Sequence, residues 1–327
     1  MLTPQQLLHI VKARLEGLDY MHEPENLYQP VRYVLSMGGK RLRPVLMLMA
    51  YNLYRSDVEA ILDPACAIEM YHNFTLLHDD LMDRADVRRG KPTVHRRWND
   101  NTAILSGDIM LSLAFKYMTD VTSDRLQPVM DTFIRTTLEI GEGQQYDMDF
   151  EHRNDVTEAE YIEMIRLKTS VLLGCSMKIG ALLAGASDED ADNLYKTGEQ
   201  MGLAFQLHDD YLDVYGDPAT FGKKVGGDIL CNKKTFLYIK AMQLANDLQR
   251  RDLQYWFSTN DTDPLFSETK IAAVTRIFTD LDMPVICHTH EDEFYHRAHA
   301  YLNKVSVPDE AKETLRAYLA SLMERTV

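Results

Sequence analysis

The sequence HNFTLLHDDLMDRADVRRGKPTVH, residues 72–95, places paired acidic residues inside a mainly apolar run. Asp79 and Asp83 are four residues apart, and residues at this spacing share one face of an α-helix. The same polar face also includes His72, Thr75 and Asp86. A helix that is apolar on most other sides is usually buried, and buried carboxylates are costly without a partner. The stretch therefore predicts either a cation on this face or a wet cleft beside it.

The HDDLMD sequence of residues 78–83 recurs as HDDYLD at residues 208–213, again within an apolar helical stretch. A single DDxxD motif is most often a solvated acidic face, because aspartate is rarely buried. Two copies in apolar surroundings instead favour a site that binds hard cations through oxygen ligands, above all Mg²⁺ shared with a phosphate. The candidate carboxylates are Asp79, Asp80, Asp83, Asp209, Asp210 and Asp213.

Together with further motifs, these segments resemble the trans-isoprenyl diphosphate synthases, the polyprenyl synthetase family that includes farnesyl and geranylgeranyl diphosphate synthases. The matching motifs are GGKRLRP at 38–44, the first DDxxD with Arg88-Arg89-Gly90, Lys168-Thr169, and FQLHDDYLD at 205–213. They follow the family's order and spacing over roughly Met37 to Lys234. The resemblance implies a prenyltransferase that condenses an allylic diphosphate with isopentenyl diphosphate.

Helix-forming residues dominate the chain, and the alternation typical of strands is scarce. We expect one all-α domain over residues 1–327, and the resemblance implies the isoprenoid synthase fold, a helical bundle around a central cavity. The first helix should begin at the Thr3-Pro4 cap. The remaining expectations are a loop over 21–30, separate helices over 157–174 and 176–186, a helix from Ser187 to Tyr215, a loop over 216–231, and two or three helices after Lys234.

Composition limits the class of partner. The chain has 327 residues, and its 35 basic and 50 acidic side chains give a net charge of −15. This charge argues against nucleic acid, whose phosphate backbone requires a basic surface. Four cysteines without paired spacing, no apolar run of membrane-spanning length and no signal-peptide pattern indicate a soluble, cytoplasmic protein. A homodimer is implied by the resemblance alone.

Basic residues beside a Gly-Gly turn predict an anion site. Lys40 and Arg43, at i and i+3, can converge on one anion where the glycines allow close backbone approach. The resemblance implies that Arg88 contacts the allylic diphosphate. It also implies that the diphosphate of isopentenyl diphosphate is held by Lys40, Arg43, His72 and Arg89. Arginine suits bidentate phosphate recognition, whereas lysine acts as a point charge.

The resemblance also assigns roles around the two aspartate motifs. It implies about three Mg²⁺ ions per site, bound by Asp79, Asp83 and Asp209, while the other three aspartates bind metal water or orient these ligands. The allylic diphosphate or its leaving group would contact Lys168, Thr169, Gln206, Lys233 and one of Lys223 or Lys224. The duplicated lysine leaves that last assignment open. Asn232 stands where the family commonly has glycine before Lys233.

Two aromatic residues bear on product length. Phe74 lies five residues before Asp79, and Tyr71 eight before. Spacing alone favours ordinary core packing for Phe74. The resemblance implies a short-chain synthase when an aromatic residue occupies this position, and Thr75 with an uninterrupted DDLMD motif resembles the geranylgeranyl type. We expect a twenty-carbon product, with fifteen-carbon farnesyl diphosphate as the alternative.

Other functions remain open. A terpene cyclase would share the first motif but usually carries an Asn/Asp-Ser/Thr-Glu second motif and binds one diphosphate. A non-catalytic partner subunit would tend to lose aspartates, whereas this chain keeps all six. A di-iron bundle needs Glu-x-x-His pairs, and only Glu69 with His72 supplies one. The His-rich segment 287–301 fits no zinc pattern, and we interpret it as an exposed polar face.

Overall fold

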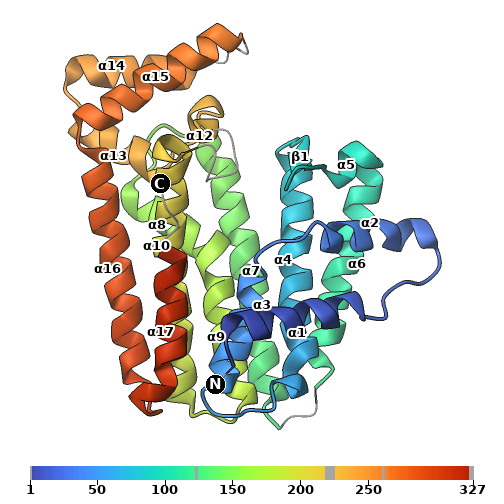
Figure 1. Cartoon of the computed structure of the whole chain (residues 1–327). Helices are drawn as coiled ribbons and strands as arrows, with labels where there is room; N and C mark the ends of the chain where they lie inside the picture. Colours follow the sequence, from blue (N-terminus) through green and yellow to red (C-terminus); the bar gives the residue numbers. More distant parts are fainter. Residues whose placement is uncertain (1, 122–123, 218–224, 260, 262, 324–327) are drawn as a thin grey trace. The chain divides into compact units, whose positions relative to one another are not determined.

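The computed structural model describes residues 2–121, 124–217, 225–259, 261 and 263–323. Within these residues the regular secondary structure is helical apart from one short antiparallel hairpin, in which Val87 pairs with Pro92 and Arg88 with Lys91 (Figure 1). None of the helices in these ranges is long and apolar enough to cross a membrane. The all-α expectation is confirmed.

The chain divides into two compact units, which are described separately. The first comprises Met1–Ile134, Cys175–Leu194 and Ser306–Leu315, and the second comprises Arg135–Gly174, Tyr195–Val305 and Arg316–Val327. Helices α7 (Leu126–Glu151), α9 (Val171–Leu183), α10 (Asp188–Tyr215) and α17 (Asp309–Met323) contribute residues to both. The single synthase domain over 1–327 stays a prediction.

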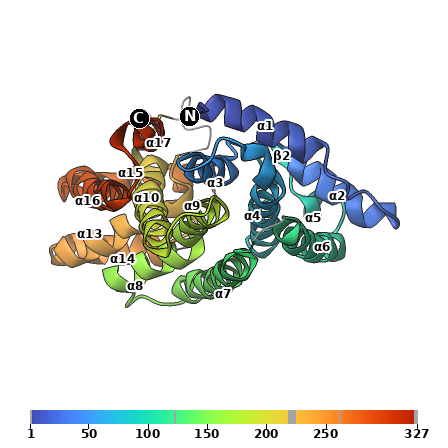
Figure 2. The same ribbon diagram turned by 90° about the horizontal axis from the view of Figure 1, so that it is seen from below.

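The first unit is built around α4 (Leu62–Met82). Figure 2 shows α4 beside α6 (Asp100–Thr119), and α4 also packs against α3 (Leu42–Asn52). Most of the first half of α4 is fully buried, as its apolar sequence predicts. The other elements of this unit are α1 (Pro4–Glu16), α2 (Glu25–Ser36), η1 (Val58–Ile61), β1 (Val87–Arg88), β2 (Lys91–Pro92) and α5 (Val94–Arg97).

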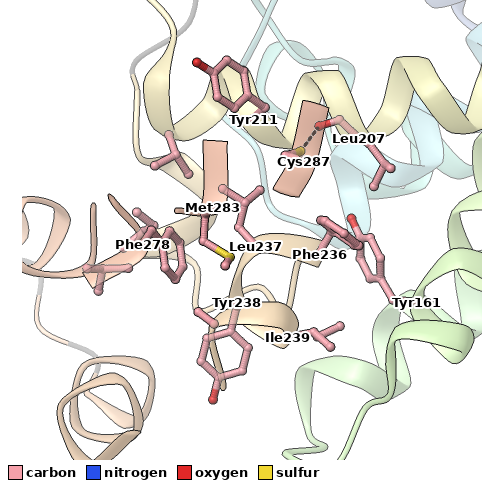
Figure 3. Close-up of a cluster of buried hydrophobic side chains, with 14 of the residues drawn as sticks. Tyr161, Leu207, Tyr211, Phe236, Leu237, Tyr238, Ile239, Phe278, Met283 and Cys287 are labelled. Atoms are coloured by element: carbon pink, nitrogen blue, oxygen red, sulfur yellow. Dashed lines mark hydrogen bonds between the residues drawn. The ribbon is translucent and has the colours of Figure 1, made fainter. Parts of the chain in front are cut away.

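The second unit contains a separate apolar core. Figure 3 shows Leu207 and Tyr211 of α10 together with Phe236, Phe278 and Cys287, all buried. The Cys287 thiol donates to the Leu207 carbonyl at 3.5 Å. The elements of this unit are α8 (Glu158–Ile165), the π-helix η2 (Arg166–Ser170), α12 (Gly227–Leu230), α13 (Phe236–Leu244), α14 (Asp247–Ser258), α15 (Pro264–Asp280) and α16 (Met283–Lys304).

The expected cap of the first helix is confirmed. Thr3 accepts a hydrogen bond from the Gln6 amide, and the Gln6 side chain accepts one from the Thr3 amide, which completes a capping box. The start of α2 differs, because the helix begins at Glu25 inside the expected loop. Pro30 removes only one backbone donor in the second turn, and Gln29 donates to Glu25 across that turn at 2.8 Å.

The expected break after Gly174 is wrong, because α8, η2 and α9 follow one another without a loop. Gly174 does not end the helix. A Cβ atom there would lie 2.8 Å from the Tyr195 carbonyl oxygen, so the glycine permits two helices to pack closely. The expected loop over 216–231 contains the short helix α12 near its end.

The region after Lys234 contains five helices in the described residues, rather than two or three. The additional start of α14 has a clear signal. The Asn246 side chain accepts hydrogen bonds from the Leu248 and Gln249 amides, and Gln249 Oε1 accepts one from the Asn246 amide. This capping box can be recognised in the sequence, but it predicts a helix start only together with the apolar residues that follow. Helix α15 begins at Pro264 and α16 at Met283, each with a proline in its first turn.

Candidate active site

The first aspartate motif lies at the end of α4 and faces the hairpin that follows it. Arg88 of β1 donates from Nε to both carboxylate oxygens of Asp80, at 2.7 and 2.8 Å, and its Nη2 lies 3.8 Å from Asp79. Asp80 is buried, and burial raises its pKa to about 6 despite the nearby guanidinium. Asp83 is the C-terminal cap of the helix. Arg88 therefore pairs with the buried Asp80, while Asp79 is only partly buried and Asp83 is exposed.

Asp86 does not join the polar face that its spacing predicted. The helix ends at Met82, and Asp86 lies beyond it with a side chain that is 74% exposed. It forms an ion pair with Arg96 at 2.5 Å. The α-helical spacing no longer applies once the helix has ended, so Asp86 is not part of the motif.

Arginine and histidine side chains of the same unit form a cationic cluster, as the Gly-Gly turn predicted. Arg43 Nη1 lies 3.2 Å from His72 Nε2. Arg89 donates to the Gly38 carbonyl, and a Cβ atom at Gly39 would lie 2.8 Å from the Arg89 guanidinium carbon. Glycine at position 39 therefore makes room for Arg89, which requires the close approach that only glycine permits.

The electrostatics of this cluster favour an anion. Burial, followed by the charges of Arg43 and Arg89, lowers the pKa of His72 well below its usual value. Burial also lowers the pKa of Arg43 to about 10. Arg43 Nε is buried and has no hydrogen-bond partner among the described residues. An anion bound here would accept a hydrogen bond from the Arg43 guanidinium and offset the repulsion among the positive charges. Lys40 is exposed just before α3.

The sequence reasoning missed Arg41, the central basic residue of GGKRLRP. Arg41 is buried in a left-handed conformation, with φ 49°, and forms an ion pair with Glu69 while donating to the Leu35 carbonyl. Because Glu69 also accepts from Asn73 at 2.7 Å, it is engaged within the protein. This arrangement removes Glu69 from the Glu-x-x-His pair of the di-iron hypothesis. Sequence alone did not distinguish the buried Arg41 from its exposed neighbour Lys40.

The second aspartate motif lines a cavity of about 200 Å³ in the second unit. Its carboxylates and lysines face a common space, together with apolar residues from α7 and α8. Seven predicted residues line it: Lys168, Thr169, Gln206, Asp209, Asp210, Asp213 and Lys233. The sequence reasoning missed Asp147, Glu151, Tyr161, Asp228 and Lys234. The first four lie on α7, α8 and α12, remote in sequence from the motif, whereas Lys234 directly follows the predicted Lys233.

A chain of hydrogen bonds fixes the predicted side chains. Thr169 Oγ1 donates to Gln206 Oε1 at 3.2 Å, and Gln206 Nε2 donates to Asp210 Oδ1 at 3.1 Å. The Tyr161 hydroxyl donates to the other Asp210 oxygen. Lys168 Nζ lies 2.6 Å from Asp147. The network aligns one carboxylate of the motif with the residues of η2.

This donor set fits a hard divalent cation. Burial and the negative charge of Asp228 raise the pKa of Asp210 well above its usual range, so its charged form is costly unless a cation accompanies it. No group of three or more His, Cys, Asp or Glu side chains in the described ranges is arranged to hold a metal by itself. Mg²⁺ suits such a site, because it keeps several waters and shares phosphate oxygens.

The segment after the motif is tied back to it. The Asp228 amide donates to Asp213 Oδ2 at 3.0 Å, and Lys233 Nζ lies 3.9 Å from Asp228. Asn232 has φ 57°, which explains the departure from glycine, because asparagine tolerates the left-handed region better than most residues. Lys223 and Lys224 lie outside the described residues.

The histidines beside the two aspartate motifs have structural contacts. His78 Nε2 lies 3.2 Å from the Ile104 carbonyl, and His208 Nδ1 lies 3.1 Å from the buried Glu291. The segment 287–301 is only partly an exposed face, because Glu291 also pairs with His288 at 3.2 Å. Glu291 therefore joins this segment to α10.

An all-α chain with two aspartate motifs, a cationic cluster and a cavity of carboxylates and lysines has the parts expected of an enzyme that acts on diphosphates. The sequence model of the polyprenyl synthetase family matches residues 24–273, and the chain belongs to this family. It is a prenyltransferase of the short-chain trans type, a polyprenyl diphosphate synthase. The predicted family, fold class and enzyme class are confirmed.

Three similar proteins illustrate the relationship. A geranylgeranyl diphosphate synthase from Methanosarcina mazei is 45% identical over 235 residues, covering 71% of this chain and 72% of the relative. A solved geranylgeranyl pyrophosphate synthase has a TM-score of 0.95 and 42% identity, and covers 100% of both chains. A geranylgeranyl pyrophosphate synthase from Corynebacterium glutamicum, solved with isoprenyl diphosphate and magnesium, has a TM-score of 0.83, 27% identity and coverage of 98% and 97%.

Proposed function

We propose that this chain condenses an allylic diphosphate with isopentenyl diphosphate to give geranylgeranyl diphosphate. The observation that carries the proposal is the cavity in which Asp209, Asp210 and Asp213 face Lys168 and Lys233. Carboxylates and ammonium groups in one space suit a diphosphate that arrives with a divalent cation. The allylic diphosphate binds there through Lys168, Thr169, Gln206 and Lys233, and Arg88 is the further contact that the family resemblance adds.

Mg²⁺ is the proposed cofactor. Asp79, Asp83 and Asp209 hold about three ions, and the magnesium-bound relative supports this choice. When bound, Mg²⁺ draws negative charge from the leaving diphosphate and so assists ionisation of the allylic C–O bond. Asp80, Asp210 and Asp213 orient the ligands and their water molecules. Lys168 holds the leaving group, and Asp147 fixes its ammonium at 2.6 Å.

The cationic cluster is the proposed site of isopentenyl diphosphate. Arg43 and Arg89 approach from α3 and the hairpin, and Lys40 adds charge from the Gly-Gly turn. Burial, together with the same charges, lowers the pKa of His72 and favours its neutral form, which accepts or donates a hydrogen bond without a charge of its own. The double bond of this substrate then attacks the allylic cation, and loss of a proton completes the longer chain.

The twenty-carbon product is proposed from an aromatic cluster along α4. The ring centroids of Phe74 and Tyr71 are 5.5 Å apart, and Tyr71 is 5.5 Å from Phe133, whose ring lies 5.1 Å from Phe115. Tyr71 and Phe74 lie N-terminal to Asp79 on α4, where a growing tail would extend away from the diphosphates. Thr75 is oriented by a hydrogen bond that its Oγ1 donates to the His72 carbonyl at 2.8 Å. One turn of helix rises about 5.4 Å, close to one isoprene unit.

We also propose that the enzyme acts in the cytoplasm as a homodimer. The four cysteines, all within the described residues, form no disulfide, which supports a reducing compartment, and three of them are buried. The dimer rests on the family resemblance. Sedimentation of the purified protein at several concentrations measures its assembly state directly.

Incubation with farnesyl diphosphate and isopentenyl diphosphate tests the proposed reaction, with diphosphate release as the readout. We expect release only when both substrates and Mg²⁺ are present. Full activity in excess EDTA would contradict the metal assignment. Release from farnesyl diphosphate alone, with a cyclic hydrocarbon as product, would instead identify a terpene cyclase.

A further inference from the structure

A buried lysine outside the aspartate-lined cavity contacts the segment that carries Lys233. Lys270 of α15 is only 2% exposed, and burying an ammonium is costly unless it is hydrogen-bonded. Its Nζ donates to the side-chain oxygen of Asn232 and lies 3.4 Å from the Thr259 carbonyl. The ammonium also lies 5.8 Å from the centre of the Phe257 ring. Lys270 itself does not line the cavity.

Asn232 is suited to this contact in two ways. Its φ of 57° lies in the left-handed region, where glycine is favoured and asparagine is tolerated. Glycine would satisfy the backbone but would offer no side-chain acceptor. Asparagine satisfies the backbone and also accepts a hydrogen bond from Lys270. In this chain, therefore, the turn is joined to α15 by a side-chain bond.

The turn that carries Asn232 contacts the second aspartate motif on one side and α15 on the other. On one side, the Asp228 amide donates to Asp213 of the second aspartate motif at 3.0 Å. The Lys233 amide donates to the Asp228 carbonyl at 3.0 Å, which fixes the residue directly after Asn232. On the other side, a Cβ atom at Gly226 would lie 2.7 Å from the Ile271 side chain, so the segment lies directly on α15.

We propose that Lys270 and Asn232 are positioning residues that hold Lys233 at the cavity for the diphosphate of the allylic substrate. The proposal rests on the proposed function, because it concerns the same cavity. Lys270 acts through Asn232, and Asn232 acts through the backbone of its neighbour Lys233. Neither residue is expected to touch the substrate.

The pair predicts non-additive effects. Replacing Asn232 alone leaves a buried ammonium with one partner fewer, and replacing Lys270 alone leaves a side-chain amide without its donor. Replacing both partners removes the mismatch, so the double variant should be less impaired than the sum of the single variants implies. Independent contributions of the two residues would instead add.

The test compares Asn232→Gly, Lys270→Met and the double variant in the full-length protein. Asn232→Gly keeps the left-handed backbone, and Lys270→Met keeps the length of the side chain without its charge. We expect each single change to raise the KM for the allylic diphosphate about tenfold, equivalent to about 1.4 kcal/mol, and to change the KM for isopentenyl diphosphate less than twofold. The allylic KM of the double variant should be no higher than that of the more impaired single variant.

Lys312 of α17 supplies a matched control. It is also buried, at 3% exposure, pairs with Asp309 of its own helix at 3.4 Å, and does not line the cavity. Lys312→Met should lower the melting temperature without raising the allylic KM. The proposal would be overturned if the Asn232 and Lys270 variants raised both KM values equally, or if their effects on the allylic KM were additive. It would also be overturned if they lowered the melting temperature without changing the allylic KM.

Binding of inorganic diphosphate with Mg²⁺, measured by calorimetry on the same variants, separates this proposal from the reaction. If the wild-type protein binds diphosphate but does not condense the two substrates, the proposed function fails and the pair is still tested. Weaker diphosphate binding in both single variants, with no further weakening in the double variant, supports the pair. Unchanged binding in all three variants contradicts it.

Discussion

Gly143 of α7 lies directly against the backbone of Lys168, so that a Cβ atom at position 143 would come within 2.4 Å of the Lys168 amide nitrogen. Lys168 and Thr169 belong to the π-helix η2, and a Cβ atom at Gly202 of α10 would lie 2.6 Å from the Ser170 Cα on the same segment. The two glycines thus leave room for a wider helical turn. Such π segments often occur at functional sites.

The first prediction concerns this contact. Gly143→Ala should displace the backbone of Lys168 and lower kcat at least about tenfold, because a 1 Å misplacement at a reacting site is costly. Gly141→Ala is the matched control, since a Cβ atom at position 141 of the same helix would meet no neighbouring atom within 4 Å. It should stabilise the protein by up to about 1 kcal/mol and keep full activity. Equal kcat values in the two variants would show that η2 tolerates the shift.

The second prediction uses the depressed pKa of His72. Below pH about 6.5 the unfolded chain binds a proton at this histidine that the folded protein does not, so the contribution of His72 to stability falls as pH falls. His72→Gln lacks this dependence. Urea unfolding should therefore show the wild type losing stability relative to the variant, by about 1 kcal/mol, between pH 7.5 and 5.5. Parallel stability curves would mean that His72 is protonated in the folded protein.

The third prediction separates the two diphosphate sites. Arg89→Ala should chiefly raise the KM for isopentenyl diphosphate, because it removes a charge from the cationic cluster. Asp79→Asn and Asp209→Asn should lower kcat about a hundredfold or more, because lost metal charge is felt most in the ionising transition state. Steady-state kinetics with each substrate varied in turn provides the measurement. Aspartate variants with normal kcat would place the chemistry elsewhere.

The fourth prediction concerns product length. Phe74→Ala removes a ring that packs against Tyr71, so the tail should extend by at least one five-carbon unit until Tyr71 stops it. Chromatography of the dephosphorylated products measures this directly. Leu76→Ala, on the same helix but outside this ring cluster, serves as the control and should keep the wild-type length. An unchanged distribution in Phe74→Ala would mean that other residues limit the chain.

Local patterns predicted the elements that depend on local physics. Thr3-Pro4 begins α1 and Ser187 caps α10 as expected, because each cap satisfies backbone groups of its own helix. The i and i+4 spacing placed Asp79 and Asp83 together while the helix lasted, and it failed for Asp86 once the helix had ended. Spacing therefore predicts side-chain direction only within known helix bounds.

Features set by packing between distant segments were not predictable from one sequence. Gly174 reads as a helix stop, but its role is decided by Tyr195, which lies 21 residues later in the chain. Arg41 reads like Lys40, but burial against Glu69 distinguishes it. The π turn at Lys168 depends on Gly143 and therefore has no local signature. The cavity partners Asp147 and Asp228 were missed for the same reason.

Mass spectrometry of the products formed from dimethylallyl diphosphate, isopentenyl diphosphate and Mg²⁺ tests the central claim most directly. The account predicts that the twenty-carbon diphosphate is the main end product, and that it forms equally from geranyl and farnesyl starters. A fifteen-carbon end product, or one of twenty-five carbons or more, would contradict the assignment of product length. Absence of any condensation product with both substrates and Mg²⁺ present would contradict the proposed reaction itself.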